Sequence, residues 1–195
     1  MKDKIKVLVV VDVQNDFITG NLGSDEALEA YDRIKDYITN WPDNEDVFIF
    51  TQDTHEANDY AGSIEGQCVV NHCRKDNWGW KIPGALRDLF EDNPYTIEKS
   101  TFGSFQLPIQ MKEVFQFRED MDEIEICGFC TDICVISNAL ILRAAFPGAK
   151  ISVLANLCAG TTPINHVNAI EVMKSNLIEV RYLVDVNQES WTTEA

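Results

Sequence analysis

The sequence is short of basic residues. It has 16 Lys plus Arg against 32 Asp plus Glu in 195 residues, which gives a formal net charge of −16 at pH 7. Nucleic acids and anionic membrane surfaces are bound by clusters of Lys and Arg, and the sequence contains no such cluster. We therefore expect neither nucleic acid nor a membrane surface as a partner.

Long apolar runs are also missing. No window reaches the roughly 20 apolar residues that a membrane-spanning helix requires. The opening MKDKIKVLVVVD places charge before an apolar run, as a signal peptide does, but Asp12 ends that run and no small-residue cleavage site follows. We expect a cytoplasmic protein.

Histidine is scarce, with 3 in the chain, whereas there are 6 cysteines. An even number of cysteines suggests disulfides in small secreted proteins, but a chain of this length with 45% hydrophobic residues can build a core without them. Free thiols are therefore favoured. The same composition excludes a disordered chain, and no repeat, low-complexity tract or linker interrupts the sequence. We expect a single domain over residues 1–195.

Short apolar runs alternate with longer amphipathic segments, a pattern typical of buried parallel strands joined by crossover helices. Strands are expected at Ile5–Val11, Val47–Thr51, Tyr95–Ile97, Ile124–Gly128, Lys150–Ala155 and Ile178–Val184. Helices are expected at Ala27–Ile38, Gly84–Phe90, Ile109–Phe115, Asp132–Ala145 and Ile164–Lys174. Residues 52–83 follow neither period, and a loop this long is usually functional. The fold class predicted is α/β: a three-layer α/β/α sandwich with a mainly parallel, doubly wound sheet of five or six strands.

Three reactive side chains fall at the carboxyl ends of these strands, where ligands of such sheets bind. Asp12 ends the first strand, Lys99 follows the third, and Cys134 lies in the first turn after the fourth. Each has an ordinary interpretation, as a turn residue, a solvated charge and a packed thiol respectively. Together they would form a reactive set, because a helix N-terminus favours a thiolate and a Lys keeps a neighbouring carboxylate ionised.

Two of the three histidines lie in the long loop beside carboxylates. Asp53 and His55 directly follow the second strand, and Glu65 and His72 come later in the same loop. Imidazole nitrogens and carboxylate oxygens are ligands for Zn, Mn and Fe. The sequence therefore predicts a metal site, the alternative being loop histidines that only contact solvent.

Five short segments of the sequence, taken in order, resemble the motifs of a known family. VVDVQNDF, FTQDTHEAND, NHC, IEKSTFGSF and CGFCTDICV resemble the isochorismatase-like cysteine hydrolase superfamily and, within it, the nicotinamidases. The resemblance runs from the first strand to at least the helix after Cys134. It implies a catalytic triad of Asp12, Lys99 and Cys134. Isochorismatases proper lack this cysteine, so its presence favours hydrolysis of an amide through a thioester.

The resemblance also implies the remaining parts of the site. The metal, expected to be zinc with Fe or Mn as alternatives, would be held by Asp53, His55, Glu65 and His72. A cis peptide bond would fall at Phe129-Cys130, and the backbone N–H groups of Cys130 and Cys134 would form the oxyanion hole. Phe17 and Phe102, with Trp78 or Trp80, would pack the ring of nicotinamide, a small-molecule substrate of NAD salvage.

Two departures from the family pattern lie near the expected substrate pocket. Asp76-Asn77 stands where the family usually has a Gly-Thr pair, and 69–71 lacks the proline pair that often precedes the third histidine ligand. Another small amide or a carbamoyl compound therefore remains an alternative substrate, and a non-catalytic metal or thiol sensor is a further alternative function. His166 is interpreted as a surface or packing residue, and the sequence is compatible with a homo-oligomer.

Overall fold

The sheet at the centre of the molecule has six strands, all parallel, in the order β3-β2-β1-β4-β5-β6. This arrangement comes from a computed structural model that describes residues 5–41, 47–56, 60–91, 93, 95–114, 116–117 and 122–183. The strands are β1 (Lys6–Val11), β2 (Val47–Asp53), β3 (Thr96–Lys99), β4 (Glu123–Phe129), β5 (Lys150–Ala159) and β6 (Glu179–Arg181). The predicted fold class is confirmed.

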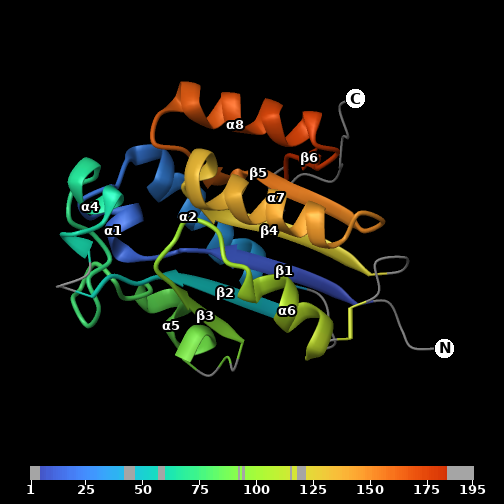
Figure 1. Ribbon diagram of the computed structural model, residues 1–195, viewed down its shortest axis with the longest axis horizontal. Coiled ribbons are helices and arrows are strands. Elements are labelled where there is room, and N and C mark those ends of the chain that lie inside the picture. Colours follow the sequence, from blue (N-terminus) through green and yellow to red (C-terminus); the bar gives the residue numbers. More distant parts are fainter. Residues whose placement is uncertain are drawn as a thin grey trace.

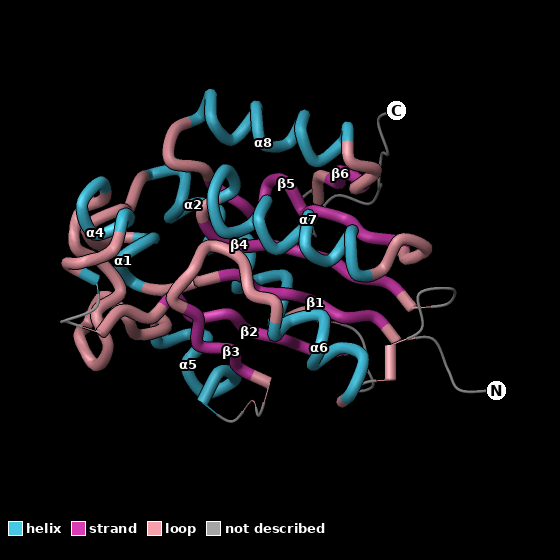
Figure 2. The backbone as a smooth tube through the Cα atoms, viewed as in Figure 1, coloured by secondary structure: helices cyan, strands magenta, loops and turns pink. Residues whose placement is uncertain are grey.

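Helices cover both faces of the sheet, as Figures 1 and 2 show. Their bounds are α1 (Asn15–Ile18), α2 (Asp25–Thr39), α4 (Ile64–Cys68), α5 (Gly84–Glu91), α6 (Gln106–Glu113), α7 (Ile136–Ala145) and α8 (Pro163–Ser175). In Figure 1, α2 lies behind the sheet and α7 in front of it. Parallel crossovers are right-handed, so the chain changes face when it returns from the β3 edge to β4 beside β1. Among the described residues, no helix has the length and apolar character needed to cross a membrane.

The core is built on β1. Each residue from Val7 to Val11 has 0% exposure, because neighbouring strands flank β1 and helices cover both of its faces. On one face α2 contributes Ala27, Tyr31 and Ile34, whose helical spacing turns them toward the sheet. Ser24 begins this helix, since its Oγ accepts a hydrogen bond from the Ala27 N–H at 3.1 Å.

A glycine lets the two central strands approach closely at their carboxyl ends. Gly128 pairs with Val11 across β4 and β1 and has φ +120. A Cβ at this position would lie 2.0 Å from the Val11 carbonyl oxygen, so no other residue fits without moving the strand. Asp12 and the turn after β4 consequently emerge side by side at the point where the strand order reverses, which is where open α/β sheets bind ligands.

The structure adjusts several predicted elements. The strand predicted at Lys150–Ala155 continues to Ala159, and the helix predicted at Asp132–Ala145 begins as a π-helix, η1 (Thr131–Val135), before α7. The helix predicted from Ile109 begins at Gln106, because Pro108 is tolerated in a first turn. The short helices α1 and α4 were not predicted. Phe115 and Val184, which end two predicted elements, lie outside the described residues.

Candidate active site

Asp12, Lys99 and Cys134 come together beyond the carboxyl ends of β1, β3 and β4. The Lys99 ammonium lies 2.6 Å from Asp12 Oδ2 and 3.5 Å from Cys134 Sγ. All three are buried, with exposures of 0%, 6% and 3% for Asp12, Lys99 and Cys134. An acid, a cation and a thiol in contact and shielded from water can exchange a proton without bulk solvent.

The backbone places Asp12 directly. Its φ of 49 lies in the left-handed region, which turns its side chain out of the strand direction. The turn is held by a bond from the Asp12 N–H to the Thr51 carbonyl at 3.1 Å. The Thr51 hydroxyl also donates to Asp12 Oδ1 at 2.7 Å, so β2 fixes both the backbone and the carboxylate.

The thiol sits in the π-helical turn that follows β4. The Phe129-Cys130 peptide bond is cis, as the resemblance implies. The Cys130 carbonyl accepts from the N–H groups of Ile133 and Val135, both at 3.1 Å, which closes the turn around Cys134. The Cys130 and Cys134 side chains both face the cavity described below, while the oxyanion role of their N–H groups stays a prediction.

Burial and neighbouring charges shift the pKa of each of the three residues. Burial raises the pKa of the Cys134 thiol well above its ordinary value, although the Lys99 charge opposes the shift, and this direction favours the thiol over the thiolate. Burial likewise raises the pKa of Asp12 against the opposing charge of Lys99. Burial alone would lower the pKa of Lys99, but Asp12, Cys134 and Asp53 outweigh it and raise the pKa. The thiol therefore needs a base, and the carboxylate beside it is a strengthened one.

A second cluster adjoins the first. Asp53, His55, Glu65 and His72 each offer one ligand atom, and these atoms all lie within 4.8 Å of one another. Lys99 links the clusters, since its ammonium is 3.5 Å from Asp53 Oδ1.

The imidazole nitrogens and carboxylate oxygens of the second cluster approach one another closely. Asp53 Oδ2 and His55 Nε2 are 2.9 Å apart, yet both are buried and neither has a hydrogen-bond partner. Burial would lower the pKa of His72, but the Asp53 and Glu65 carboxylates, 3.2 and 3.5 Å from its Nε2, raise it to about 10, a sign of excess negative charge. Two imidazoles and two carboxylates around one point fit a divalent cation such as zinc.

Three consecutive side chains after β1 hold the loop that carries these ligands. Gln14 accepts from the Asp53 N–H at 2.8 Å and donates to the carbonyls of Asp53 and Trp80, both at 2.9 Å. Asn15 donates to the Trp78 carbonyl at 2.8 Å, and Asp16 accepts from the Cys73 N–H at 2.8 Å. Sequence analysis missed this role. The signal available was the polar run QND at residues 14–16, which begins three residues after the apolar run ends at Val11.

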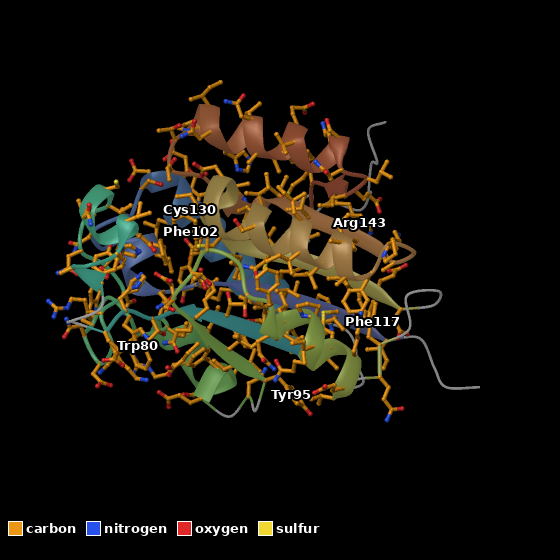
Figure 3. All side chains as sticks on the ribbon, viewed as in Figure 1. Trp80, Tyr95, Phe102, Phe117, Cys130 and Arg143 are labelled. Atoms are coloured by element: carbon orange, nitrogen blue, oxygen red, sulfur yellow. The ribbon has the colours of Figure 1, made fainter. Side chains whose placement is uncertain are left out.

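Both clusters open into one cavity of about 350 Å³. Its lining includes Leu22, Val69 and Ile133 beside Asp53, His72 and Cys134. The predicted ring-packing residues Phe17 and Phe102 lie on its wall. Phe102 and Cys130, both labelled in Figure 3, line this cavity.

The two tryptophans do not line this cavity, contrary to the suggestion that one of them packs the ring. Trp78 is 59% exposed, and the Trp80 indole N–H donates to the Thr54 hydroxyl at 2.9 Å. Trp80 is drawn apart from the pair Phe102 and Cys130 in Figure 3. The backbone carbonyls of Trp78 and Trp80 are bound by Asn15 and Gln14, which holds both residues outside the cavity lining.

His166 packs against the turn that carries Cys134, as the packing alternative for this residue expects. It is half-buried, and its Nδ1 lies 2.8 Å from the hydroxyl of Thr131, the first residue of η1. The next residue, Asp132, accepts from the N–H and hydroxyl of Thr161 at 2.8 and 2.6 Å. The start of α8 therefore supports the turn that carries the thiol.

Known proteins are similar to this chain in sequence and fold. The family described as Isochorismatase domain matches residues 6–183. The chain belongs to the isochorismatase family. A relative within this family, the nicotinamidase/pyrazinamidase of Mycobacterium tuberculosis, is 28% identical over 185 residues, covering 90% of this chain and 98% of its own. An uncharacterized isochorismatase family protein of Bacillus subtilis is 27% identical over 150 residues, covering 69% of this chain and 76% of its own.

Solved isochorismatase-family structures agree with the fold. The crystal structure of nicotinamidase/pyrazinamidase from Bacillus subtilis is 26% identical with a TM-score of 0.73, covering 90% of this chain and 98% of that one. The pyrazinamidase of Pyrococcus horikoshii in complex with zinc is 22% identical with a TM-score of 0.73, covering 91% and 99% of the two chains, and shares the fold. The predicted superfamily and its nicotinamidase branch are confirmed, and the comparisons indicate an amidohydrolase.

Proposed function

We propose that this isochorismatase-family protein is a metal-assisted cysteine amidohydrolase that converts nicotinamide to nicotinic acid and ammonia. The observation that carries the proposal is that one cavity joins the thiol, the candidate metal ligands and two aromatic side chains. A planar ring between Phe17 and Phe102 would place its amide at Cys134 and a ring nitrogen toward the metal ligands. The similarity to nicotinamidase/pyrazinamidase relatives supports this substrate.

In the first half of the reaction, Asp12 removes the proton from Cys134, and the sulfur attacks the amide carbonyl carbon. Lys99 keeps Asp12 ionised until the proton arrives and balances the charge afterwards. The backbone N–H groups of Cys130 and Cys134 would stabilise the oxyanion, each donor contributing about 2.7 to 4 kcal/mol. When the C–N bond breaks, Asp12 returns its proton to the nitrogen and ammonia leaves.

In the second half, Asp12 accepts a proton from a water molecule that attacks the thioester. The C–S bond breaks, the acid is released, and the sulfur recovers the proton from Asp12. One carboxylate therefore serves both halves. The residues that would hold a divalent cation are Asp53, His55, Glu65 and His72, and the cation would supply a Lewis acid for a ring nitrogen or a water.

The test is ammonia release from nicotinamide by purified protein of known metal content. Cys134→Ala should abolish release, because it removes the thiol beside Asp12 and Lys99 that would form the thioester. Cys68→Ala is the matched control, since Cys68 is an exposed thiol that does not line the cavity, and it should keep full activity. Removal of metal with a chelator should suppress release and added zinc should restore it.

Other outcomes would contradict the proposal in distinguishable ways. Inactivity toward nicotinamide with rapid alkylation of Cys134 would retain a cysteine hydrolase and direct the search to other small amides or carbamoyl compounds. Inactivity with an unreactive Cys134 would favour the sensor alternative. Full activity of Cys134→Ala would exclude the nucleophile assigned here.

A further inference from the structure

Asn138 is a buried amide that the mechanism does not use. It has 0% exposure and lies on the inner face of α7 next to Ala139 and near Leu142. A buried amide in apolar surroundings destabilises the fold unless its donors and acceptor are satisfied. The contacts of this side chain therefore indicate what it holds in place.

The Asn138 side chain binds three backbone groups at once. Its Oδ1 accepts from the Ser104 N–H at 2.9 Å. Its Nδ2 donates to the Cys134 carbonyl at 2.8 Å and to the Phe102 carbonyl at 3.2 Å. One amide thus joins the residue that carries the thiol to both sides of Gly103, in the loop between β3 and α6.

That loop has few other attachments. Within the part of the chain that the structure describes, the hydrogen bonds from residues 101–105 to elements other than α6 are those to Asn138. Gly103 lies against α7 so closely that a Cβ there would be 2.5 Å from Ile141 Cδ1. Phe102 itself is 40% exposed, so packing alone does not fix its ring.

The turn that carries the thiol is held from several sides. The Cys130 carbonyl accepts two N–H groups within the turn, and Asp132 binds Thr161 at the start of α8. Loss of the Asn138 amide would consequently release the loop rather than the thiol. Phe102 would move, while Cys134 would stay beside Lys99.

We propose that Asn138 is a positioning residue that sets Phe102 at a fixed distance from Cys134 and thereby makes the cavity selective for planar aromatic amides. The substrate class rests on the proposed function, but the positioning does not. Phe102 and Cys130, both labelled in Figure 3, line the same cavity, and Asn138 ties the turn after Cys130 to the loop that carries Phe102.

The test measures alkylation of Cys134 by two reagents, iodoacetamide and its N-phenyl derivative, with site-resolved mass spectrometry. In the wild type the aromatic reagent should react faster, because its ring packs against Phe102. Asn138→Ala and Phe102→Ala should each reduce this preference by about threefold to tenfold, the range expected for one lost aromatic contact. The rate with iodoacetamide itself should change little.

The double variant decides whether Asn138 acts through Phe102. Asn138→Ala combined with Phe102→Ala should show the same preference for the aromatic reagent as Phe102→Ala alone, since the ring that Asn138 positions is already absent. Additive losses, or an equal loss of reactivity toward both reagents in Asn138→Ala, would overturn the proposal.

Two further variants separate positioning from stability. Asn138→Thr introduces a hydroxyl that can donate to the carbonyl four residues earlier but cannot reach the loop. It should therefore lose the preference for the aromatic reagent. This variant provides the test if Asn138→Ala does not fold. Asn176→Ala is the matched control: its amide donates to the Val172 carbonyl at 2.8 Å, also four residues earlier, far from the cavity, and should retain the preference. A wild-type preference in Asn138→Thr would overturn the proposal.

With nicotinamide as substrate, Asn138→Thr should raise KM by about threefold to tenfold with a smaller change in kcat, as expected for weakened binding of the ring. If the wild type does not hydrolyse nicotinamide, the proposed function fails while the alkylation experiment still tests Asn138. A fall in kcat at constant KM would contradict positioning of the ring.

Discussion

Asp12 has both an unusual backbone conformation and a carboxylate in contact with Lys99. Its backbone adopts a positive φ that most side chains disfavour, while its carboxylate accepts from Thr51 and pairs with Lys99. Asn adopts this backbone conformation more readily than most residues. Asn is therefore the substitution that removes the base and leaves the backbone in place.

Asp12→Asn should lower kcat/KM by about 10² to 10⁴, the usual contribution of a general base. The wild type should also lose activity as the pH falls, because a protonated carboxyl cannot accept the thiol proton. Burial raises the pKa of Asp12, so this loss begins at a higher pH than the ordinary value of 3.8 would give. A pH–rate profile of both proteins checks this, and an unchanged acid limb in Asp12→Asn would assign the limb to another group.

At the scale of elements, the segment from β1 into α1 both connects these elements and holds the end of β2 in position. Gln14 binds the backbone of Asp53 on both sides, so the first strand and its loop fix a metal-ligand candidate at the end of β2. Gln52 offers a comparison. It donates to the same Trp80 carbonyl at 3.0 Å, and among the bonds of the described residues its side chain makes none to Asp53.

Gln14→Leu should weaken zinc binding by about tenfold to a hundredfold, the effect typical of removing a group that orients a metal ligand. Gln52→Leu, which loses one bond to the same carbonyl, should bind zinc within a few-fold of the wild type. Competition with a chromophoric chelator measures both affinities. Equal losses in the two variants would mean that the packing of the Trp80 loop, and not the position of Asp53, controls affinity.

The sequence predicts the strands and the reactive residues at their ends, because apolar runs mark buried strands and parallel strands share one carboxyl edge. It does not predict the bonds of Gln14 or Asn138, whose partners are mostly backbone groups. A carbonyl or an N–H is the same for every residue, so no sequence pattern marks it as a partner. The π-helical turn at Thr131 is hidden for a similar reason, since its residues follow the same apolar period as an α-helix.

At the scale of the whole molecule, the cysteines of the described chain divide by burial. Cys68 is exposed, while Cys73, Cys127, Cys130, Cys134 and Cys158 are buried. Burial raises the pKa of each buried thiol, to about 12 for Cys130 and Cys158. The folded protein therefore keeps protons that the unfolded chain releases near its ordinary thiol pKa of 9.0.

The free energy of unfolding should consequently fall as the pH rises above about 9. A group whose pKa is raised on folding contributes its full stability below the unfolded pKa and loses it above, by about 1.4 kcal/mol per pH unit for each thiol. Urea unfolding of the reduced protein between pH 8 and 10.5 measures the slope. Cys127→Ala should reduce the slope of unfolding free energy against pH by the contribution of one thiol, about 1.4 kcal/mol per pH unit, whereas Cys68→Ala should leave the slope unchanged.

The strand order also has a consequence for synthesis on the ribosome. Asp12, the metal-ligand candidates and Lys99 all precede residue 100, whereas β4 begins at Glu123 and completes the other side of β1. A nascent chain that stops short of β4 would carry Asp12 and the metal-ligand candidates but not Cys134. It would also expose the bare edge of β1, an aggregation-prone surface. Entry of β4 covers that edge and is followed at once by Cys134, so the proposed nucleophile is synthesised only when the fold can bury it.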